Sequence, residues 1–476
     1  MNAKSLSKSD RIGIIGAGPA GVYTAHLLAK RGFTQVTLLE GSGSIGGKSV
    51  TVQRDGVRHE LGTCFLHPGY DLVFPLLEEL GMESAMRPAS PRGGEIHFPG
   101  SSTSMQEWML GGRGLSNILP GARLLASLRR YIELHREVWP DFHPGLPPQP
   151  ERWEGLDMTF ESFLRQHKLE NLIPLFWITM FAQGYGDLKT TPTFYGLSWI
   201  TPALVSAIMQ STLGRPSLLI LPQGWAEVWE RLARLHDMDI ILNARISKIE
   251  RPESGPAQVY WSSDGRRESE SFDHVIMATP MQRGVELFEE ASAEESEVFR
   301  SLKPSQMSTL LFEAARAPQG HCIRYYPGAI QGSSQGHVYG IRNSAQALGH
   351  TIDDRTFVAH QYCPTAQSKE DLLDRALTDL DIYGFEGVRA IEQRVFSYAP
   401  RFDQRGLEAG LPWRIEALQG QRGTWYVGGS VSFESVNDIT HHANKLVARM
   451  AAAATDRSES LVLRAQAQRA RVVRAG

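Results

Sequence analysis

Residues 12–21 read IGIIGAGPAG, and this stretch decides the fold. A short apolar run followed by G-x-G-x-x-G is the pattern of a buried strand that turns tightly into a helix. Pro19 stands at the expected first position of that helix, and Gly32 lies just beyond its expected end. The mainly apolar residues 35–40 follow as a second strand, so the segment 11–40 predicts a β-α-β unit of a parallel sheet.

The three glycines of this turn indicate a site for a dinucleotide. They let the backbone approach a pyrophosphate, which then lies at the positively polarised start of the helix. Glu40 ends the second strand, 19 residues after Gly21, where a carboxylate can accept hydrogen bonds from the adenosine ribose. The residues predicted to hold this part of the ligand are Gly16, Gly18, Pro19, Ala20, Gly21 and Glu40.

Later glycine turns favour FAD over NAD as the ligand. A Gly-Gly pair at residues 46–47 lies shortly after the ribose carboxylate, and residues 60–63 (ELGT) allow another close backbone approach. The closing segment 425–430 (WYVGGS) reads as a strand entering a turn, followed by a helix around 438–450 whose start would face the flavin ring. The further predicted FAD contacts are Gly41, Gly46, Gly47, Lys48, Leu61, Gly62, Thr63, Ile246, Gly428, Gly429, Asp438 and Ile439.

The bulk properties exclude several classes of function. The chain has 476 residues, of which 42% are apolar and 21% charged, and a net charge of −3 gives no reason to expect nucleic-acid binding. Three scattered cysteines lack the spacing of a metal site and suit a reducing, cytoplasmic location. The polar N-terminus does not read as a secretory signal, and the uncharged run 194–214 fits a buried helix pair better than a transmembrane span.

We expect an α/β fold in which a Rossmann-type FAD-binding domain carries an inserted α+β substrate domain and a helical cap. Apolar periodicity predicts helices from 105 to 214, whereas residues 93–100 and 305–400 suggest a second sheet with one helix. Residues 239–250 read as a single strand. The predicted parts are a discontinuous FAD-binding domain (10–92, 215–280 and 400–450), a β-rich substrate domain (93–104 and 281–399), the helical cap (105–214) and a basic tail (451–476).

The basic tail, from about residue 455 onward, has a weakly amphipathic pattern. We expect a frayed helix or a disordered end there, with contact to a membrane surface as the alternative. The sequence leaves the oligomeric state open.

Taken together, these motifs resemble the flavin-containing amine oxidase superfamily. The resemblance covers roughly residues 10–450 and rests on GAGPAG, Glu40, GSIGGK, ELG, LPQGWAEVWERLA (221–233), DHVIMATP (273–280) and the closing segment from 426 to 450. Four features are similar to the polyenoic fatty acid isomerases within that superfamily: GGK, GEIHFP (94–99), FAQGYGDL (181–188) and the SF…ND…H pattern near the end.

The resemblance implies an FAD-dependent double-bond isomerase acting on a polyunsaturated fatty acid or a similar lipophilic polyene. Hydride would pass to flavin N5 and return at another carbon, so no protein base, metal or net redox change is required. Arg87 matches the position of a clamp for the substrate carboxylate, and His59 matches a position beside the flavin. Among the aromatic residues of 176–199, we predict that Phe181, Tyr185 and Trp199 contact the substrate.

Three positions depart from the family pattern. Gly429 stands where an acidic residue usually contacts the ribityl chain, and Ser430 is the available substitute. Ser308 occupies the place where amine oxidases carry a lysine near the flavin, and Pro202 the place of an aromatic residue at the substrate carboxylate. An oxidase or desaturase acting on an amine or polyene, and an FAD-bound protein without turnover, therefore remain as alternatives.

Overall fold

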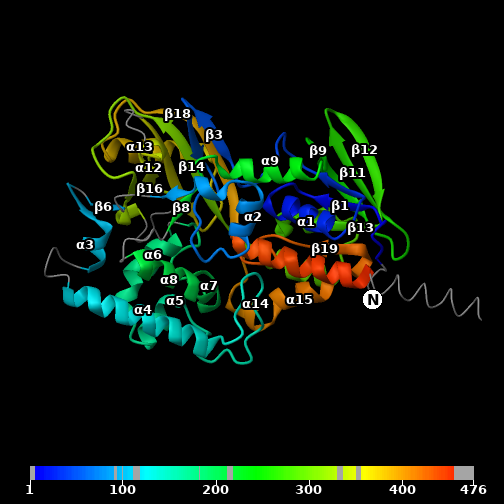
Figure 1. Ribbon diagram of the computed structural model, residues 1–476, viewed down its shortest axis with the longest axis horizontal. Helices are drawn as coiled ribbons and strands as arrows, with labels where there is room; N and C mark the ends of the chain where they lie inside the picture. Colours follow the sequence, from blue (N-terminus) through cyan, green and yellow to red (C-terminus); the bar gives the residue numbers. More distant parts are fainter. Residues whose placement is uncertain are drawn as a thin grey trace, which may run out of the picture. The chain divides into compact units, whose positions relative to one another are not determined.

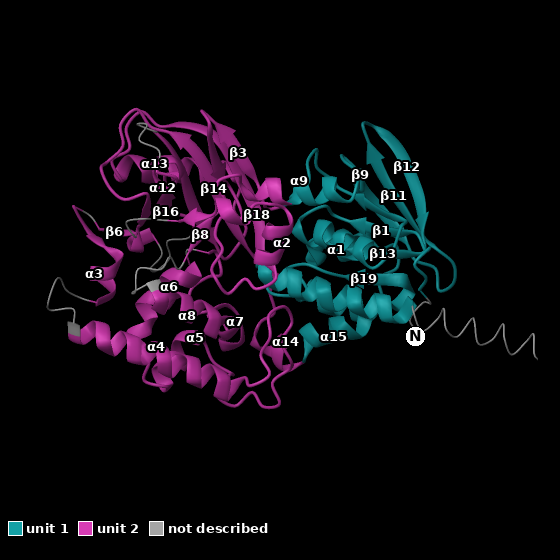
Figure 2. Ribbon diagram, in the orientation of Figure 1, with its two compact units in different colours: residues 1–47, 229–302, 410–476 teal, residues 48–228, 303–409 magenta. Residues whose placement is uncertain are grey.

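The computed structural model describes residues 6–89, 94–98, 100–110, 118–181, 183–211, 218–329, 336–349 and 355–454. It divides into two compact units (Figure 2). Unit 1 comprises residues 1–47, 229–302 and 410–476, and unit 2 comprises residues 48–228 and 303–409. The domain boundaries expected from the sequence stay a prediction. The tail from residue 455 lies outside the described residues.

Unit 1 is built on a parallel sheet in the strand order β19-β13-β1-β2-β9. Strands β1 and β13 are buried along their whole length, as expected of parallel strands that are covered on both faces. The strand expected at the start of the sequence is therefore confirmed. The strands of this sheet are β1 (Ile12–Ile15), β2 (Val36–Leu39), β9 (Asp239–Ile241), β13 (His274–Met277) and β19 (Thr424–Tyr426).

Helices pack on this sheet (Figure 1). Helix α1 (Pro19–Lys30) begins at Pro19 and packs on β1 and β2, and Gly32 beyond its end has φ of 82°, so both expected helix boundaries are confirmed. Helix α15 packs on β19, and residues 436–454 are helical. The other helices of unit 1 are α10 (Met281–Gly284), η4 (Val285–Leu287), α11 (Ala293–Arg300), α15 (Leu411–Leu418) and η6 (Gln421–Gly423). Helix α9 (Trp225–Leu235) runs across the boundary between the units.

The expectation of a single strand over 239–250 is wrong. The structure has β9 in the parallel sheet and β10 (Arg245–Glu250) in a separate antiparallel sheet. Asn243, between them, has φ of 56°, a left-handed conformation that asparagine tolerates and that ends a strand. The sheet of β10 also contains β11 (Ala257–Ser263) and β12 (Arg266–Phe272).

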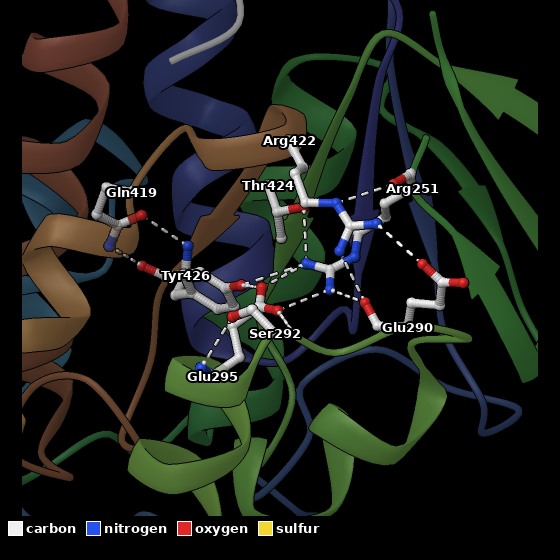
Figure 3. Close-up of polar contacts among 8 residues, drawn as sticks. All are labelled: Arg251, Glu290, Ser292, Glu295, Gln419, Arg422, Thr424 and Tyr426. Atoms are coloured by element: carbon white, nitrogen blue, oxygen red, sulfur yellow. Dashed lines mark hydrogen bonds and ion pairs between the residues drawn. The ribbon is translucent and has the colours of Figure 1, made fainter. Parts of the chain in front are cut away.

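A buried ion pair joins three elements of unit 1 (Figure 3). Arg251, at the end of β10, donates to both carboxylate oxygens of Glu295 at 2.6 and 2.9 Å. The Tyr426 hydroxyl on β19 donates to the same carboxylate at 2.5 Å, and the backbone N–H of Ser292 donates to it at 2.7 Å. The Arg251 guanidinium also lies 3.4 Å from the ring centroid of Phe288. The start of α11 is thus fixed to both sheets.

Unit 2 contains a seven-stranded sheet in the order β18-β14-β17-β16-β15-β6-β7. Helix α13 (Lys369–Ile382) packs on β14, β16 and β17, and the Gln361 side chain of β17 donates to the Leu372 carbonyl of that helix. Gln361 therefore marks the face of the sheet that α13 covers. The strands are β6 (Glu95–Phe98), β7 (Ser101–Ser104), β14 (Lys303–Glu313), β15 (Ile323–Tyr325), β16 (Val338–Arg342), β17 (Thr356–Cys363) and β18 (Arg389–Arg401).

Helices fill much of the rest of unit 2, as expected for residues 105–214 (Figure 1). The run 194–214 forms a helix pair through residue 211, and no helix in the described part of the chain is long and apolar enough to cross a membrane. The helices are α2 (Val73–Glu79), η1 (Glu83–Ala85), α3 (Met105–Leu110), α4 (Ile118–Val138), α5 (Phe160–Gln166), η3 (Glu170–Leu172), α6 (Ile173–Phe181), α7 (Thr193–Trp199), α8 (Pro202–Ser211), η5 (Pro327–Ala329), α12 (Ser344–Ala347) and α14 (Gln404–Glu408).

The expectation of one helix within 305–400 is wrong, because α12 precedes α13. Asn343 caps this short helix, since its side-chain oxygen accepts from the Gln346 N–H at 2.9 Å. Two small antiparallel sheets complete unit 2: β3 (Thr51–Arg54) with β4 (Val57–Glu60), and β5 (Arg87–Pro88) with β8 (Leu219–Ile220).

Candidate functional site

The glycine turn of unit 1 leaves the start of α1 open to a ligand. Gly16 has φ of 106°, and a Cβ added at Gly21 would lie only 1.9 Å from the Gly16 carbonyl oxygen. The first helical hydrogen bond runs from the Val22 N–H to Gly18, so the two preceding amides point out of the helix end. Such an end binds a pyrophosphate.

Glu40 is fixed beside this turn at the end of β2. Its carboxylate accepts from the Ala17 N–H at 2.8 Å and from the Ser42 N–H and hydroxyl at 2.9 and 2.7 Å. These bonds orient the carboxylate and leave lone pairs for a further donor. The placement fits a ribose hydroxyl pair.

Two further glycine segments of unit 1 converge on the same turn. The Gly46 N–H donates to the Ala17 carbonyl at 2.9 Å, and a Cβ at Gly47 would lie 2.9 Å from the Gly18 Cα. Gly428 has φ of 104°, and its Cβ would lie 3.3 Å from the Ala20 side chain. Backbone therefore surrounds the start of α1, as an extended dinucleotide requires.

The closing turn carries polar side chains close to Gly429. The buried Ser430 hydroxyl accepts from the Met281 N–H at 3.0 Å, so it holds the turn after β13. A Cβ at Gly429 would lie 3.0 Å from the side chain of Glu434. The carboxyl group of Glu434 therefore lies beside Gly429. Asp438 and Ile439 lie in the first turn of the following helix.

Four predicted cofactor contacts of unit 2 lie together. A Cβ at Gly62 would lie 1.7 Å from the Lys48 carbonyl oxygen, and the Thr63 N–H donates to that oxygen at 3.1 Å. Leu61 donates to the Val50 carbonyl at 2.8 Å. The ELGT segment therefore packs directly on the backbone that follows the glycine pair. This close packing requires glycine at position 62, because any side chain there would collide with the Lys48 carbonyl oxygen.

One face of the seven-stranded sheet of unit 2 carries aromatic side chains. Tyr325 lies opposite Gly340, which lies opposite His360, and residues 360 and 362 alternate to the same face of β17. Tyr398 lies opposite Ser305, two residues before the Met307 that pairs with Tyr362. This face is opposite to the one that α13 covers. We call it the aromatic wall and define it by Tyr325, His360, Tyr362 and Tyr398.

The structure brings Phe181 and Tyr185 to this wall and packs Trp199 on Tyr185. The ring centroid of Phe181 lies 5.1 Å from that of Tyr362. Tyr185 lies 4.4 Å from Trp199 and 5.8 Å from Tyr398 by the same measure. Phe181, Tyr185 and Trp199 are all buried. Tyr362 and Tyr398 were missed because they come from strands that are distant in sequence.

Glycines in FAQGYGDL permit this arrangement. Gly184 has φ of 78°, and its Cβ would lie 2.1 Å from the Met307 sulfur. A Cβ at Gly186 would lie 2.8 Å from the Tyr362 hydroxyl. The Arg401 guanidinium donates to the Tyr185 carbonyl at 2.6 Å and holds the turn from its other side. The motif therefore positions Tyr185 against the sheet.

A cavity of about 380 Å³ opens beyond Tyr362. Besides the phenol of Tyr362, the side chains of Arg401 and Lys303 border it, and so do the carboxylates of Asp157 and Asp403. Lys303 and Asp403 pair with each other at 3.2 Å. Two cations and two carboxylates thus share this cavity.

A match to the family model described as flavin containing amine oxidoreductase spans residues 19–319. That is more than half of the chain. The protein belongs to the flavin-containing amine oxidoreductase family. Its membership makes the protein a flavin-dependent enzyme, either an isomerase or an oxidoreductase. The resemblance and the amine oxidase-like α/β fold expected from the sequence are both confirmed.

The individual relatives of this protein are distant from it in sequence. Polyenoic fatty acid isomerase of Ptilota filicina is 22% identical over 92% of this chain and 94% of its own, and putrescine oxidase of Kocuria rosea is 29% identical over 32% and 30%. The crystal structure of a CLA-producing fatty acid isomerase from P. acnes has a TM-score of 0.78 at 22% identity and covers 94% of this chain and 99% of that chain. Wild-type putrescine oxidase bound to putrescine has a TM-score of 0.65 at 17% identity, with 93% and 98% covered. Such likenesses establish the fold.

The remaining predicted residues make other contacts than those that define the aromatic wall. Arg87 is exposed, and its guanidinium donates to the carbonyls of Ala85 and Met86 at 3.0 and 2.9 Å. His59 is buried on β4. Ser308 accepts from Gln393 on the α13 side of β14, so Ser308 does not face the wall. The assignments of Arg87 and His59 stay predictions, as does that of Ile246 on β10.

Burial determines the charge of the titratable groups near the wall. It lowers the pKa of His360 to about 3, so this imidazole is neutral at pH 7. Burial also raises the pKa of Glu60 to about 7, although the N–H of Trp225 and the charge of Arg342 oppose the change. Among the described residues, no group of three or more histidine, cysteine or acidic side chains could hold a metal ion.

Proposed function

We propose that this enzyme binds FAD and moves double bonds within a polyunsaturated fatty acid or a similar lipophilic polyene. The observation that carries the proposal is the aromatic wall, with Phe181 packed on Tyr362 and Tyr185 packed near Tyr398. Buried rings offer a hydrocarbon an apolar surface and offer a delocalised cation the faces of π-systems.

The residues of unit 1 fit FAD. The open start of α1 suits a pyrophosphate, and the oriented carboxylate of Glu40 suits ribose hydroxyls. Glu434 supplies a carboxylate beside Gly429, where a ribityl chain would need an acceptor. The cofactor, when bound, supplies a hydride acceptor that is absent from the amino-acid side chains.

In this proposal the chain positions the polyene and excludes water. The rings of Phe181, Tyr362 and Tyr398 face the double bonds of the substrate and stabilise the positive charge that develops there by about 1–2 kcal/mol. His360 is neutral and therefore does not repel that positive charge. The protein moves no proton, because the same hydride leaves and returns.

An oxidase or desaturase that keeps the electrons is the second candidate function. An amine substrate would carry an ammonium group, and the buried Arg342 lies on the same face of the sheet as the aromatic wall. A fixed cation there disfavours an ammonium ion. This observation favours a neutral or acidic lipophilic substrate over an amine.

An anaerobic assay tests the proposal. The purified protein with FAD is mixed with linoleate, and ultraviolet and visible spectra are recorded together. We expect growth of conjugated-diene absorption while the flavin remains oxidised. Persistent bleaching of the flavin would show a net oxidation instead, and absence of change with a panel of polyenes would support a protein without turnover.

A further inference from the structure

Arg342 places a buried cation on the wall's face of the sheet. It ends β16 and lies opposite Val358 of β17, and residues 358, 360 and 362 alternate to one face. Arg342 is only 5% exposed. A guanidinium retains its charge even when buried, so its surroundings must compensate for the lost hydration.

The contacts of Arg342 are with neutral groups. It donates to the Glu60 backbone carbonyl at 2.5 Å and lies 5.6 Å from the centroid of the Phe65 ring. Its charge opposes the rise that burial causes in the pKa of the nearby Cys64 thiol. Within the described residues, no carboxylate lies within 4 Å of this guanidinium.

The carboxylate of Glu60 is occupied elsewhere. It accepts from the Trp225 N–H at 2.9 Å and from the Thr51 hydroxyl at 3.1 Å, which fixes it at the start of α9. The positive charge of Arg342 lowers the pKa of Glu60, but the two side chains do not form an ion pair. The guanidinium therefore lacks a bound counter-ion.

Four side chains near Arg342 are only partly buried. Cys64, Phe65, Tyr325 and His360 each keep accessible surface. Partial burial raises the pKa of the Cys64 thiol and of the Tyr325 phenol and lowers that of His360. Because the four side chains keep accessible surface, protein does not completely cover this end of the wall, and a ligand can approach it.

We infer that Arg342 binds the carboxylate of a long-chain unsaturated acid whose hydrocarbon chain extends along the aromatic wall. The inference rests on the proposed function and names the head-group site of its substrate. A carboxylate would supply the missing counter-ion, and a guanidinium fork can hold both of its oxygens. Arg342 is thus a residue that determines specificity for an acid.

The spacing along β17 selects the position of the double bonds. Val358, opposite Arg342, lies four residues from Tyr362, which is roughly 13 Å at the rise of a strand. An extended acid held at Arg342 would therefore bring its mid-chain carbons to the rings of Tyr362 and Phe181. An acid with double bonds in the middle of its chain fits this distance, and a short acid does not reach.

Two other arginines of unit 2 suit this task less well. Arg87 is exposed, and carbonyls of its own turn already occupy its guanidinium. Arg401 borders the cavity that the carboxylates of Asp157 and Asp403 also line, and these would repel an acid. Arg342 is the more strongly buried and the less compensated cation.

Binding measurements separate these assignments without relying on turnover. The flavin-loaded protein is titrated calorimetrically with linoleate, methyl linoleate and linoleyl alcohol below their micelle concentrations. We expect the wild type to bind the acid at least about tenfold more tightly than the alcohol, since hydrogen bonds to a charged group contribute that much. Arg342→Gln should remove the preference by weakening acid binding, while Arg342→Lys should keep part of it.

Control variants and ligands make the test decisive. Arg316→Gln removes an exposed arginine that pairs with Glu386 and should leave the preference unchanged. Full acid preference in Arg342→Gln would overturn the inference, as would its loss in Arg87→Gln alone. If Arg342→Gln does not fold, equal wild-type affinity for acid and alcohol overturns it. Diene formation with unchanged preference refutes only this inference, whereas acid binding at Arg342 without turnover refutes only the proposed function.

Discussion

At the scale of single residues, Glu295 carries the negative charge of the buried ion pair in unit 1. Its side chain is 5% exposed, and it faces the Arg251 side chain, which is 1% exposed. The Glu295→Gln variant should lower the free energy of unfolding by about 3–5 kcal/mol, because Arg251 would remain buried without a compensating charge. Chemical denaturation at pH 7 measures this loss. Glu297→Gln, on the same helix but at an exposed pair with Arg414, should change stability little.

The pKa of the same carboxylate predicts how the stability of the fold depends on pH. Burial raises the pKa of Glu295, but the hydrogen bonds and charge of Arg251 outweigh this and lower it from 4.5 to about 2. Because the folded pKa is depressed, the contribution is present above about pH 4.5 and is lost as pH falls towards 2. Wild-type stability should therefore fall more steeply than that of Glu295→Gln in this range. Parallel curves for the two proteins would contradict the pairing.

For Glu60 we predict a change of stability with pH of the opposite sign. Burial raises its pKa from 4.5 to about 7, so the folded state binds its proton more tightly than the unfolded state does. Its contribution is fully present below pH 4.5 and is lost as pH rises to about 7. Glu60→Gln keeps an acceptor for the Trp225 N–H and should flatten this part of the stability curve. Thermal unfolding from pH 4.5 to 7.5 compares the two proteins; an unchanged slope would refute the assignment.

Among elements, the glycine turn before α1 gives the sharpest prediction. Gly21→Ala places a Cβ 1.9 Å from the Gly16 carbonyl oxygen, so the turn must open and flavin binding should be lost. Gly32→Ala is the matched control at the other end of α1. Its φ of 82° makes the change cost about 1–2 kcal/mol, but the nearest atom lies 3.8 Å away and flavin binding should survive. The visible absorption of the purified variants shows which of them retain flavin. A yellow Gly21→Ala protein would contradict the prediction.

Helices and strands could be predicted from the sequence where a few neighbouring residues determine them. Pro19 and Gly32 marked the ends of α1, and the apolar run of β1 required burial on both faces. The break between β9 and β10 was missed, because Asn243 adopts a left-handed conformation that its sequence neighbourhood only permits. Glu434 was missed because its approach to Gly429 depends on how a turn closes.

At the scale of the whole molecule, the aromatic wall could not have been read from the sequence. Its residues come from β15, β17 and β18, and they share a face only because of the strand order and register. Phe181, Tyr185 and Trp199 lie close together in the sequence, so the composition of their cluster was visible beforehand. Arg342 gave no signal in the sequence, because only the pairing with β17 reveals its face.

The central claim is that the glycine turns of unit 1 hold FAD, and cofactor analysis tests it directly. The purified protein is denatured, and the released cofactor is separated and identified by mass. We predict a yellow protein that releases one FAD per chain without covalent attachment. A colourless protein that stays colourless after incubation with FAD, or one that releases a different nucleotide, would contradict the account.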